Sequence, residues 1–218
     1  MPKTLASLIT HGPYQHMFGG EWIVCAPELC VLVSKVISIW AYLDSVVLTR
    51  LLSLISGTSS STAIAVYESM KSDGTKFAVL DAVARVNLND REYKLFQNLF
   101  TIIKMQANSR HKLVHWIWGY SQDLPHCLLL ISPKNYAAGK TDEIQGVAFS
   151  GPIPEHLQKY FSKIEVYQKT DLEKIISEFI ETSKYAERFC LLWNPDFQGN
   201  KRVEIFQSLC NEPEIQSQ

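Results

Sequence analysis

The sequence lacks an excess of charge of either sign. Its 218 residues include 21 Lys plus Arg against 22 Asp plus Glu, which gives a net charge of -1. A nearly neutral chain provides no extended cationic field, so nonspecific binding to long nucleic acid is not indicated, although a local basic site stays open. A hydrophobic content of 46% supplies enough apolar surface for a core, and we therefore expect a folded protein.

The chain also lacks a cysteine framework. Its cysteines are odd in number, scattered and set mostly among apolar neighbours; they are Cys25, Cys30, Cys127, Cys190 and Cys210. This pattern is typical of buried free thiols in a reducing cytoplasm, and it disfavours both a secreted disulfide scaffold and a Cys-paired zinc site. We therefore expect a cytoplasmic protein.

No uncharged apolar run approaches the ~20 residues that a membrane-spanning helix requires. The most hydrophobic region, residues 29–55, contains Lys35, Asp44 and Arg50. We interpret it as a buried core helix whose charged side chains need a polar network or a subunit interface, with membrane insertion as the minor alternative. The first 20 residues are too weakly apolar to predict a signal peptide.

Several catalytic signatures are missing as well. The segment GTSSSTA at residues 57–63 has neither the lysine of a P-loop nor the glycine spacing of a dinucleotide site, and no serine lies in a GxSxG elbow. We therefore expect no cofactor. His11, His16 and His126 lie in settings more typical of structural histidines than of chemical groups.

What the sequence does contain is helical periodicity, which predicts a mainly α-helical protein. Pro27 suits the first turn of a long helix that ends before Gly57, and Asn89 suits the N-cap of another that ends with Gly119 as a left-handed C-cap. The expected helices cover residues 27–55, 63–70, 75–86, 90–119 and 172–193. In the last of these, Thr170 and Glu173 have capping-box spacing.

Beyond Gly119 the pattern changes. Residues 124–133 and 163–168 predict two strands that would pair as a small antiparallel ribbon, with a loop and a short helix between them. No linker or repeat is evident, so we expect a single domain over residues 1–218. It would comprise a helical core over 27–119, followed by the ribbon and a C-terminal helix over 120–218.

The segment 108–119, NSRHKLVHWIWG, carries the most informative polar residues. On a helix His111 and His115 share one face, whereas Arg110 lies about 140° around the axis from His115. Histidine exchanges protons near neutral pH, and a guanidinium stabilises negative charge that develops on a phosphoryl group. The pair Arg110 and His115 therefore favours RNA cleavage by the 2′-hydroxyl without a metal, provided that distortion or a second subunit brings the two groups together.

Two other interpretations of the same residues stay open. Arg110, His111, Lys112 and His115 lie in the last turns of the predicted helix, where basic side chains stabilise the helix dipole. The two histidines are also half of a metal site, which would need carboxylate or further histidine ligands from elsewhere. Position 112 has Lys where an HExxH motif has Glu, and this cation would oppose metal binding. We therefore expect no metal.

Arg110, His111, three further residues and His115 together resemble the R-x4-6-H signature of the HEPN superfamily, the higher eukaryote and prokaryote nucleotide-binding domains. The long helices of residues 27–119 are also similar to those of HEPN proteins. The resemblance implies a helical bundle with Arg110 and His115 as a ribonuclease pair, and with His111 and Lys112 as accessory residues. It further implies an RNA substrate, a homodimer that joins two copies in one cleft, and a toxin or defence role with an antitoxin protein. The charges within residues 29–55, and not the resemblance, predict that the protein has no membrane partner. The alternative is a catalytically silent helical binding or assembly module.

Overall fold

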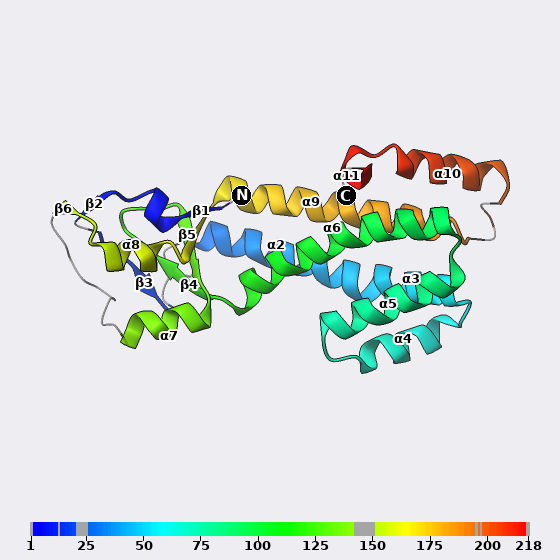
Figure 1. Cartoon of the computed structure of the whole chain (residues 1–218), viewed down its shortest axis with the longest axis horizontal. Helices are drawn as coiled ribbons and strands as arrows, with labels where there is room; N and C mark the ends of the chain where they lie inside the picture. Colours follow the sequence, from blue (N-terminus) through cyan, green and yellow to red (C-terminus); the bar gives the residue numbers. More distant parts are fainter. Residues whose placement is uncertain are drawn as a thin grey trace. The chain divides into compact units, whose positions relative to one another are not determined.

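The computed structural model describes residues 2–12, 14–20, 26–141, 151–194, 196 and 198–216. The chain is mainly helical with a small antiparallel sheet, as the hydrophobic pattern predicts. It forms two compact units, and each of them combines two separate stretches of sequence (Figure 1). We call Met1–Ile37 with Ser109–Ser177 the sheet unit, and Ser38–Asn108 with Glu178–Gln218 the helical unit.

One long helical segment near the N-terminus contributes to both units. It consists of α2 (Pro27–Tyr42), the π-helical η2 (Leu43–Leu48) and α3 (Thr49–Ser56). Pro27 begins the segment and Gly57 ends it with a φ of 66°, which confirms the predicted limits. Judged by length and composition alone, the segment would suffice to cross a membrane, a criterion that core helices of soluble proteins also meet.

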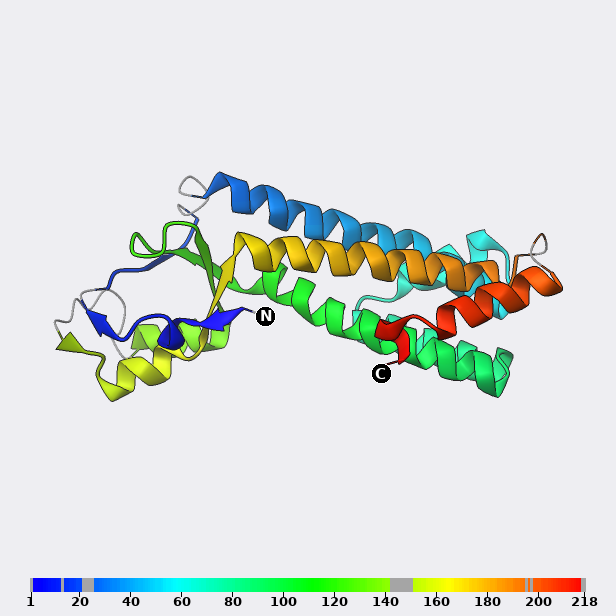
Figure 2. The ribbon, with the colours of Figure 1, turned by 90° about the horizontal axis from the view of Figure 1, so that it is seen from above.

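In the helical unit, aromatic side chains form much of the core. Its further helices are α4 (Ser60–Ser69), α5 (Asp73–Asn87), most of α6 (Asp90–His115) and of α9 (Lys169–Leu191), α10 (Asn200–Cys210) and α11 (Pro213–Gln216). Helices α4 and α5 pack on α3, and α10 runs beside α9 (Figures 1 and 2). The Phe96 ring stacks on Phe100 at 4.8 Å, and Gln106 donates hydrogen bonds to the Glu178 carbonyl at 3.0 Å and to Thr182 at 2.5 Å. The hydrogen bonds of Gln106 join α6 to α9.

The charged residues of the long helical segment differ in their environments. Asp44, in η2, accepts hydrogen bonds from the Tyr67 hydroxyl at 2.8 Å and from the Lys76 ammonium at 2.7 Å. Burial and the adjacent carboxylate raise the pKa of Tyr67, so its hydroxyl stays protonated and donates. The predicted polar network is therefore confirmed for Asp44, whereas Lys35 and Arg50 are exposed.

Among the described residues, the larger sheet of the sheet unit has five antiparallel strands in the order β1-β7-β5-β4-β3. Their bounds are β1 (Lys3–Thr4), β3 (Met17–Phe18), β4 (Ile117–Tyr120), β5 (Cys127–Ile131) and β7 (Ile164–Gln168); β2 (His11–Gly12) pairs with β6 (Gly151–Pro152). The predicted antiparallel ribbon is confirmed as β5 with β7, in which Leu129 lies opposite Val166. Every residue of β5 is buried, so β5 is covered on both faces.

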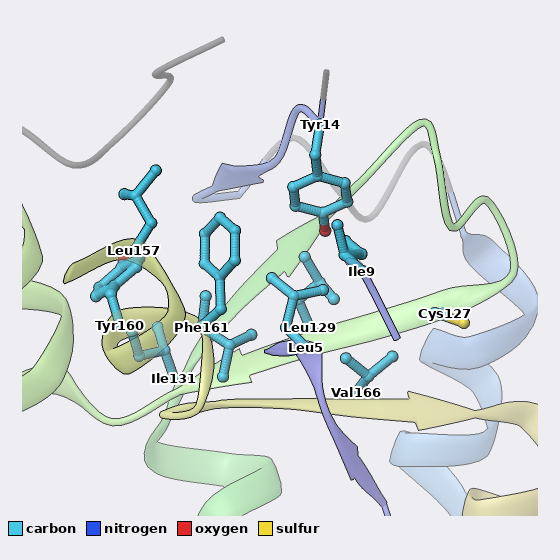
Figure 3. Packing of buried hydrophobic residues seen from close by; sticks show 11 residues of the cluster. Leu5, Ile9, Tyr14, Cys127, Leu129, Ile131, Leu157, Tyr160, Phe161 and Val166 are labelled. Carbon is cyan, nitrogen blue, oxygen red and sulfur yellow. The ribbon is translucent and has the colours of Figure 1, made fainter. Parts of the chain in front are cut away.

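Residues from the N-terminal segment and from α8 (Glu155–Phe161) cover one face of this sheet. The cluster comprises Leu5, Ile9, Tyr14, Cys127, Leu129, Ile131, Leu157, Tyr160, Phe161, Ile164 and Val166 (Figure 3). The strand residues alternate along β5 and β7, and therefore point to the same side. Further short elements of the sheet unit are η1 (Leu5–Ser7) and α7 (Pro133–Thr141).

The structure corrects the predicted end of the helix over residues 90–119. Asn89 is the N-cap, since its side chain accepts from the Arg91 and Glu92 amides at 3.1 Å, but α6 ends at His115. Gly119 is not a C-cap; it lies in β4 opposite Phe18, and an added Cβ would be 2.5 Å from that ring. The glycine therefore permits a close approach between strands.

The predicted capping box of the last long helix, Thr170 with Glu173, is wrong by two residues. Helix α9 begins at Lys169, and the Asp171 carboxylate accepts the Gln168 amide at 3.0 Å. Asp171 thus performs the role that the sequence suggested for Glu173, because the helix starts directly after β7.

Candidate functional site

The last turns of α6 carry all four predicted site residues, and all four belong to the sheet unit. Leu113 is fully buried and fixes the rotation of this helix end. His111 and His115 are each two residues from Leu113, or about 200° around the axis, so both face away from the core. Arg110 is three residues from Leu113 and lies about 60° from it, at the edge of the buried side.

The histidine pair is exposed and its members are in contact. The His111 and His115 ring centroids are 4.7 Å apart with 43° between the ring planes. Neither imidazole forms a hydrogen bond or an ion pair with any residue that the structure describes. Both rings are therefore available to a ligand, a substrate or a second chain.

Lys112 points away from this pair and toward the sheet. Its ammonium lies 2.5 Å from Glu165 Oε1 on β7 and 5.1 Å from the centre of the Trp116 ring. The other Glu165 oxygen accepts from the Tyr167 hydroxyl at 2.9 Å. Burial, first, and the Glu165 charge, second, raise the pKa of Tyr167, which keeps that donor protonated. Lys112 thus contributes an anchored, neutralised charge rather than a free cation.

The turn from α6 into β4 is held by a second side chain. Trp118 donates its indole N–H to the Leu113 carbonyl at 2.9 Å, and the Trp116 amide donates to the Lys112 carbonyl at 3.0 Å. These bonds satisfy acceptors that the end of a helix would otherwise leave open. They orient the histidine-bearing turn relative to the sheet.

Arg110 has an unsatisfied donor. The residue is half-buried, and its Nε is shielded from solvent without a hydrogen-bond acceptor among the described residues. Buried donors almost always have acceptors, so an unpaired guanidinium N–H marks a position where an anion would be stabilised. No hydrogen bond or ion pair with a described residue joins Arg110 to His115, and their helical separation of about 140° holds the two groups apart.

The remaining histidines differ from one another. His16 lies among Tyr14, Phe18, Tyr160 and Phe161, with ring separations of 5.4 to 6.4 Å, and its Nε2 is buried without a partner. Burial lowers the pKa of His16 to about 4, as expected for a neutral structural histidine. His126 is exposed, with its Nδ1 3.7 Å from Glu28 Oε1. The side chain of His11 lies outside the described residues.

Sequence reasoning missed Glu165, the residue that fixes Lys112. It is the acidic residue inside the alternating segment KIEVYQ, a position where a charge on a buried strand needs a partner. That partner is 53 residues away along the chain, so only the fold reveals it.

Among the described residues, no group of three or more His, Cys, Asp or Glu side chains converges as a metal site.

Comparisons with protein-family models, with curated proteins and with solved structures give no match to this chain.

Proposed function

We propose that this protein is a metal-independent endoribonuclease of the HEPN type, in which Arg110 and His115 act together on one phosphodiester. The observation that carries the proposal is the Arg110 Nε, which is buried, positively charged and without an acceptor among the described residues. A phosphate oxygen is the acceptor that a guanidinium binds best. A cytoplasmic toxin or defence role, with an antitoxin partner, would suit an enzyme of this type.

The chemistry requires one proton acceptor and one stabiliser of negative charge. His115 would take the proton of an RNA 2′-hydroxyl as its oxygen attacks the adjacent phosphorus. Arg110 would stabilise the negative charge on the phosphoryl oxygens in the transition state. The P–O bond to the 5′-oxygen breaks, the leaving oxygen takes a proton from water or from the protonated His115, and the products are a 2′,3′-cyclic phosphate and a 5′-hydroxyl end. His111 is adjacent as an accessory polar group.

One chain alone does not bring the two groups to a single phosphate, because they lie about 140° apart on α6. A homodimer related by a two-fold axis would place Arg110 of one copy opposite His115 of the other. The exposure of His111 and His115 supports this arrangement, since neither ring is engaged by a described part of its own chain.

A catalytically silent binding module is the second candidate, and the ion pair between Lys112 and Glu165 favours it. This ion pair is structural, and it shows that a basic residue of this turn can serve the fold alone. In that case His111 and His115 would contact a partner without transferring protons.

Incubation of the purified chain with mixed RNAs in excess chelator separates the two candidates. The ribonuclease predicts cleavage with cyclic phosphate ends, and a loss of ~100-fold or more on His115→Ala or Arg110→Gln. His156→Ala changes an exposed histidine on α8 and is the matched control, which should retain full activity. Cleavage that survives His115→Ala would contradict the assignment, and an inactive wild type would favour the binding module.

A further inference from the structure

We propose that His111 and His115 form a binding site for a borderline divalent cation, Zn²⁺ in particular, that regulates the exposed face of α6. The site goes beyond the proposed ribonuclease, which needs no metal. It depends on the geometry of two side chains within one helix turn, and on the absence of competing partners for their ring nitrogens among the described residues.

The spacing of the two rings suits chelation. Zinc–nitrogen bonds of ~2.0 to 2.1 Å at tetrahedral or octahedral angles put two ligand nitrogens roughly 3 Å apart. The ring centroids are 4.7 Å apart, and the nitrogens lie on the ring edges, so small side-chain rotations bring one nitrogen of each ring to that separation. The ring planes meet at 43°, so the two rings are not stacked face to face.

The charge environment is more favourable than the sequence suggests. Lys112 lies between the two histidines in sequence, and a free ammonium there would repel a cation. In the structure this ammonium is 2.5 Å from the Glu165 carboxylate, and it points toward the sheet rather than along the histidine face. The Lys112–Glu165 ion pair is close to neutral as a unit, so Lys112 does not repel a cation bound at the two histidines.

The ligand set decides the class of ion. Imidazole nitrogens prefer Zn²⁺, Ni²⁺ and Cu²⁺ to the hard cations Mg²⁺ and Ca²⁺. The described residues provide no third ligand, so water molecules would complete the coordination sphere, as is usual for open sites. An ion held in this way uses the lone pair of the His115 ring nitrogen that it binds. If the proposed ribonuclease is correct, zinc would therefore inhibit it.

Isothermal titration of the untagged full chain with ZnCl₂ at pH 7.5 tests the site directly, with circular dichroism as a check on the fold of each variant. We expect one ion per chain, with His111→Ala and His115→Ala each weakening the affinity about tenfold or more, because each removes one of two ligands. MgCl₂ should give no binding. His156→Ala removes an exposed histidine from α8 and should leave the isotherm unchanged.

Two results would overturn the site: no zinc uptake by the wild type, or uptake that either single alanine variant retains at full affinity. The second result would mean binding elsewhere on the chain. The titration contains no RNA, so its outcome is separate from that of the cleavage assay in chelator. Zinc binding without ribonuclease activity would leave this inference standing and refute only the proposed function.

Discussion

The buried histidine of the sheet unit should make the stability of this protein depend on pH. His16 is enclosed by aromatic rings, and burial lowers its pKa from 6.5 to about 4. The unfolded chain takes up a proton at this site below about pH 6.5, while the folded chain resists it until about pH 4. The free energy of unfolding is therefore highest above pH 6.5 and falls as the pH decreases through this window.

The size of the effect follows from the shift. A difference of about 2.5 pKa units, at 1.36 kcal/mol each, corresponds to roughly 3 kcal/mol below pH 4, of which about 2 kcal/mol is already lost at pH 5. For a chain whose whole stability is ~5 to 15 kcal/mol, this is a large loss.

Urea unfolding at pH 7 and pH 5 measures it, with His16→Phe and His16→Leu as the perturbations. Both variants remove the titrating group and keep the site apolar. Between pH 7 and pH 5, the free energy of unfolding of each variant should therefore decrease by about 2 kcal/mol less than that of the wild type. His156→Phe, at an exposed position on α8, should decrease in parallel with the wild type. Equal losses in the wild type and both His16 variants would refute the assignment of a neutral buried His16.

Two further stability predictions concern particular contacts. Gly119→Ala should destabilise the fold by roughly 1–3 kcal/mol in urea unfolding, since the new Cβ would lie 2.5 Å from the Phe18 ring; Gly74→Ala, whose nearest neighbour would be 3.9 Å away, should cause no loss. Lys76→Met should cost about 3 kcal/mol because it leaves the Asp44 carboxylate half-buried without its counter-ion. Adding Asp44→Asn, which removes the charge and keeps an acceptor for the Tyr67 hydroxyl, should recover much of that loss; a double variant as unstable as the single one would contradict this explanation.

The helices were the predictable part of the fold. Pro27, Gly57 and Asn89 act on the backbone within a few residues of themselves, so their effects can be inferred from the sequence and are confirmed. The strands β1, β3 and β4 were not predicted, because they have two to four residues and depend on partners far away in the chain. Gly119 was assigned to a helix end for the same reason: its partner Phe18 lies about a hundred positions earlier.

The two units were not visible in the sequence either. A boundary is usually marked by a polar or flexible linker, but here α2, α6 and α9 are continuous helices that contribute residues to both units. The apolar pattern therefore continues through the point where one unit ends and the other begins.

For the candidate site, the helical positions of the residues were predictable, but their tertiary contacts were not. The four-residue spacing of His111 and His115 correctly placed them on one face. The ion pair of Lys112 with Glu165 and the unsatisfied Nε of Arg110 depend on tertiary packing, which no local pattern encodes. The ion pair neutralises the Lys112 cation, and the unsatisfied Arg110 Nε leaves a position open for an anion.

The most direct test of a shared Arg110–His115 site is a complementation experiment with two inactive variants. Co-expression of Arg110→Gln and His115→Ala chains gives mixed dimers that keep one intact site, formed by Arg110 of one copy and His115 of the other. With random pairing, the mixture should regain about a quarter of the wild-type RNA cleavage, while each variant alone stays inactive. A mixture as inactive as either variant, beside an active wild type, would contradict a site shared between two copies.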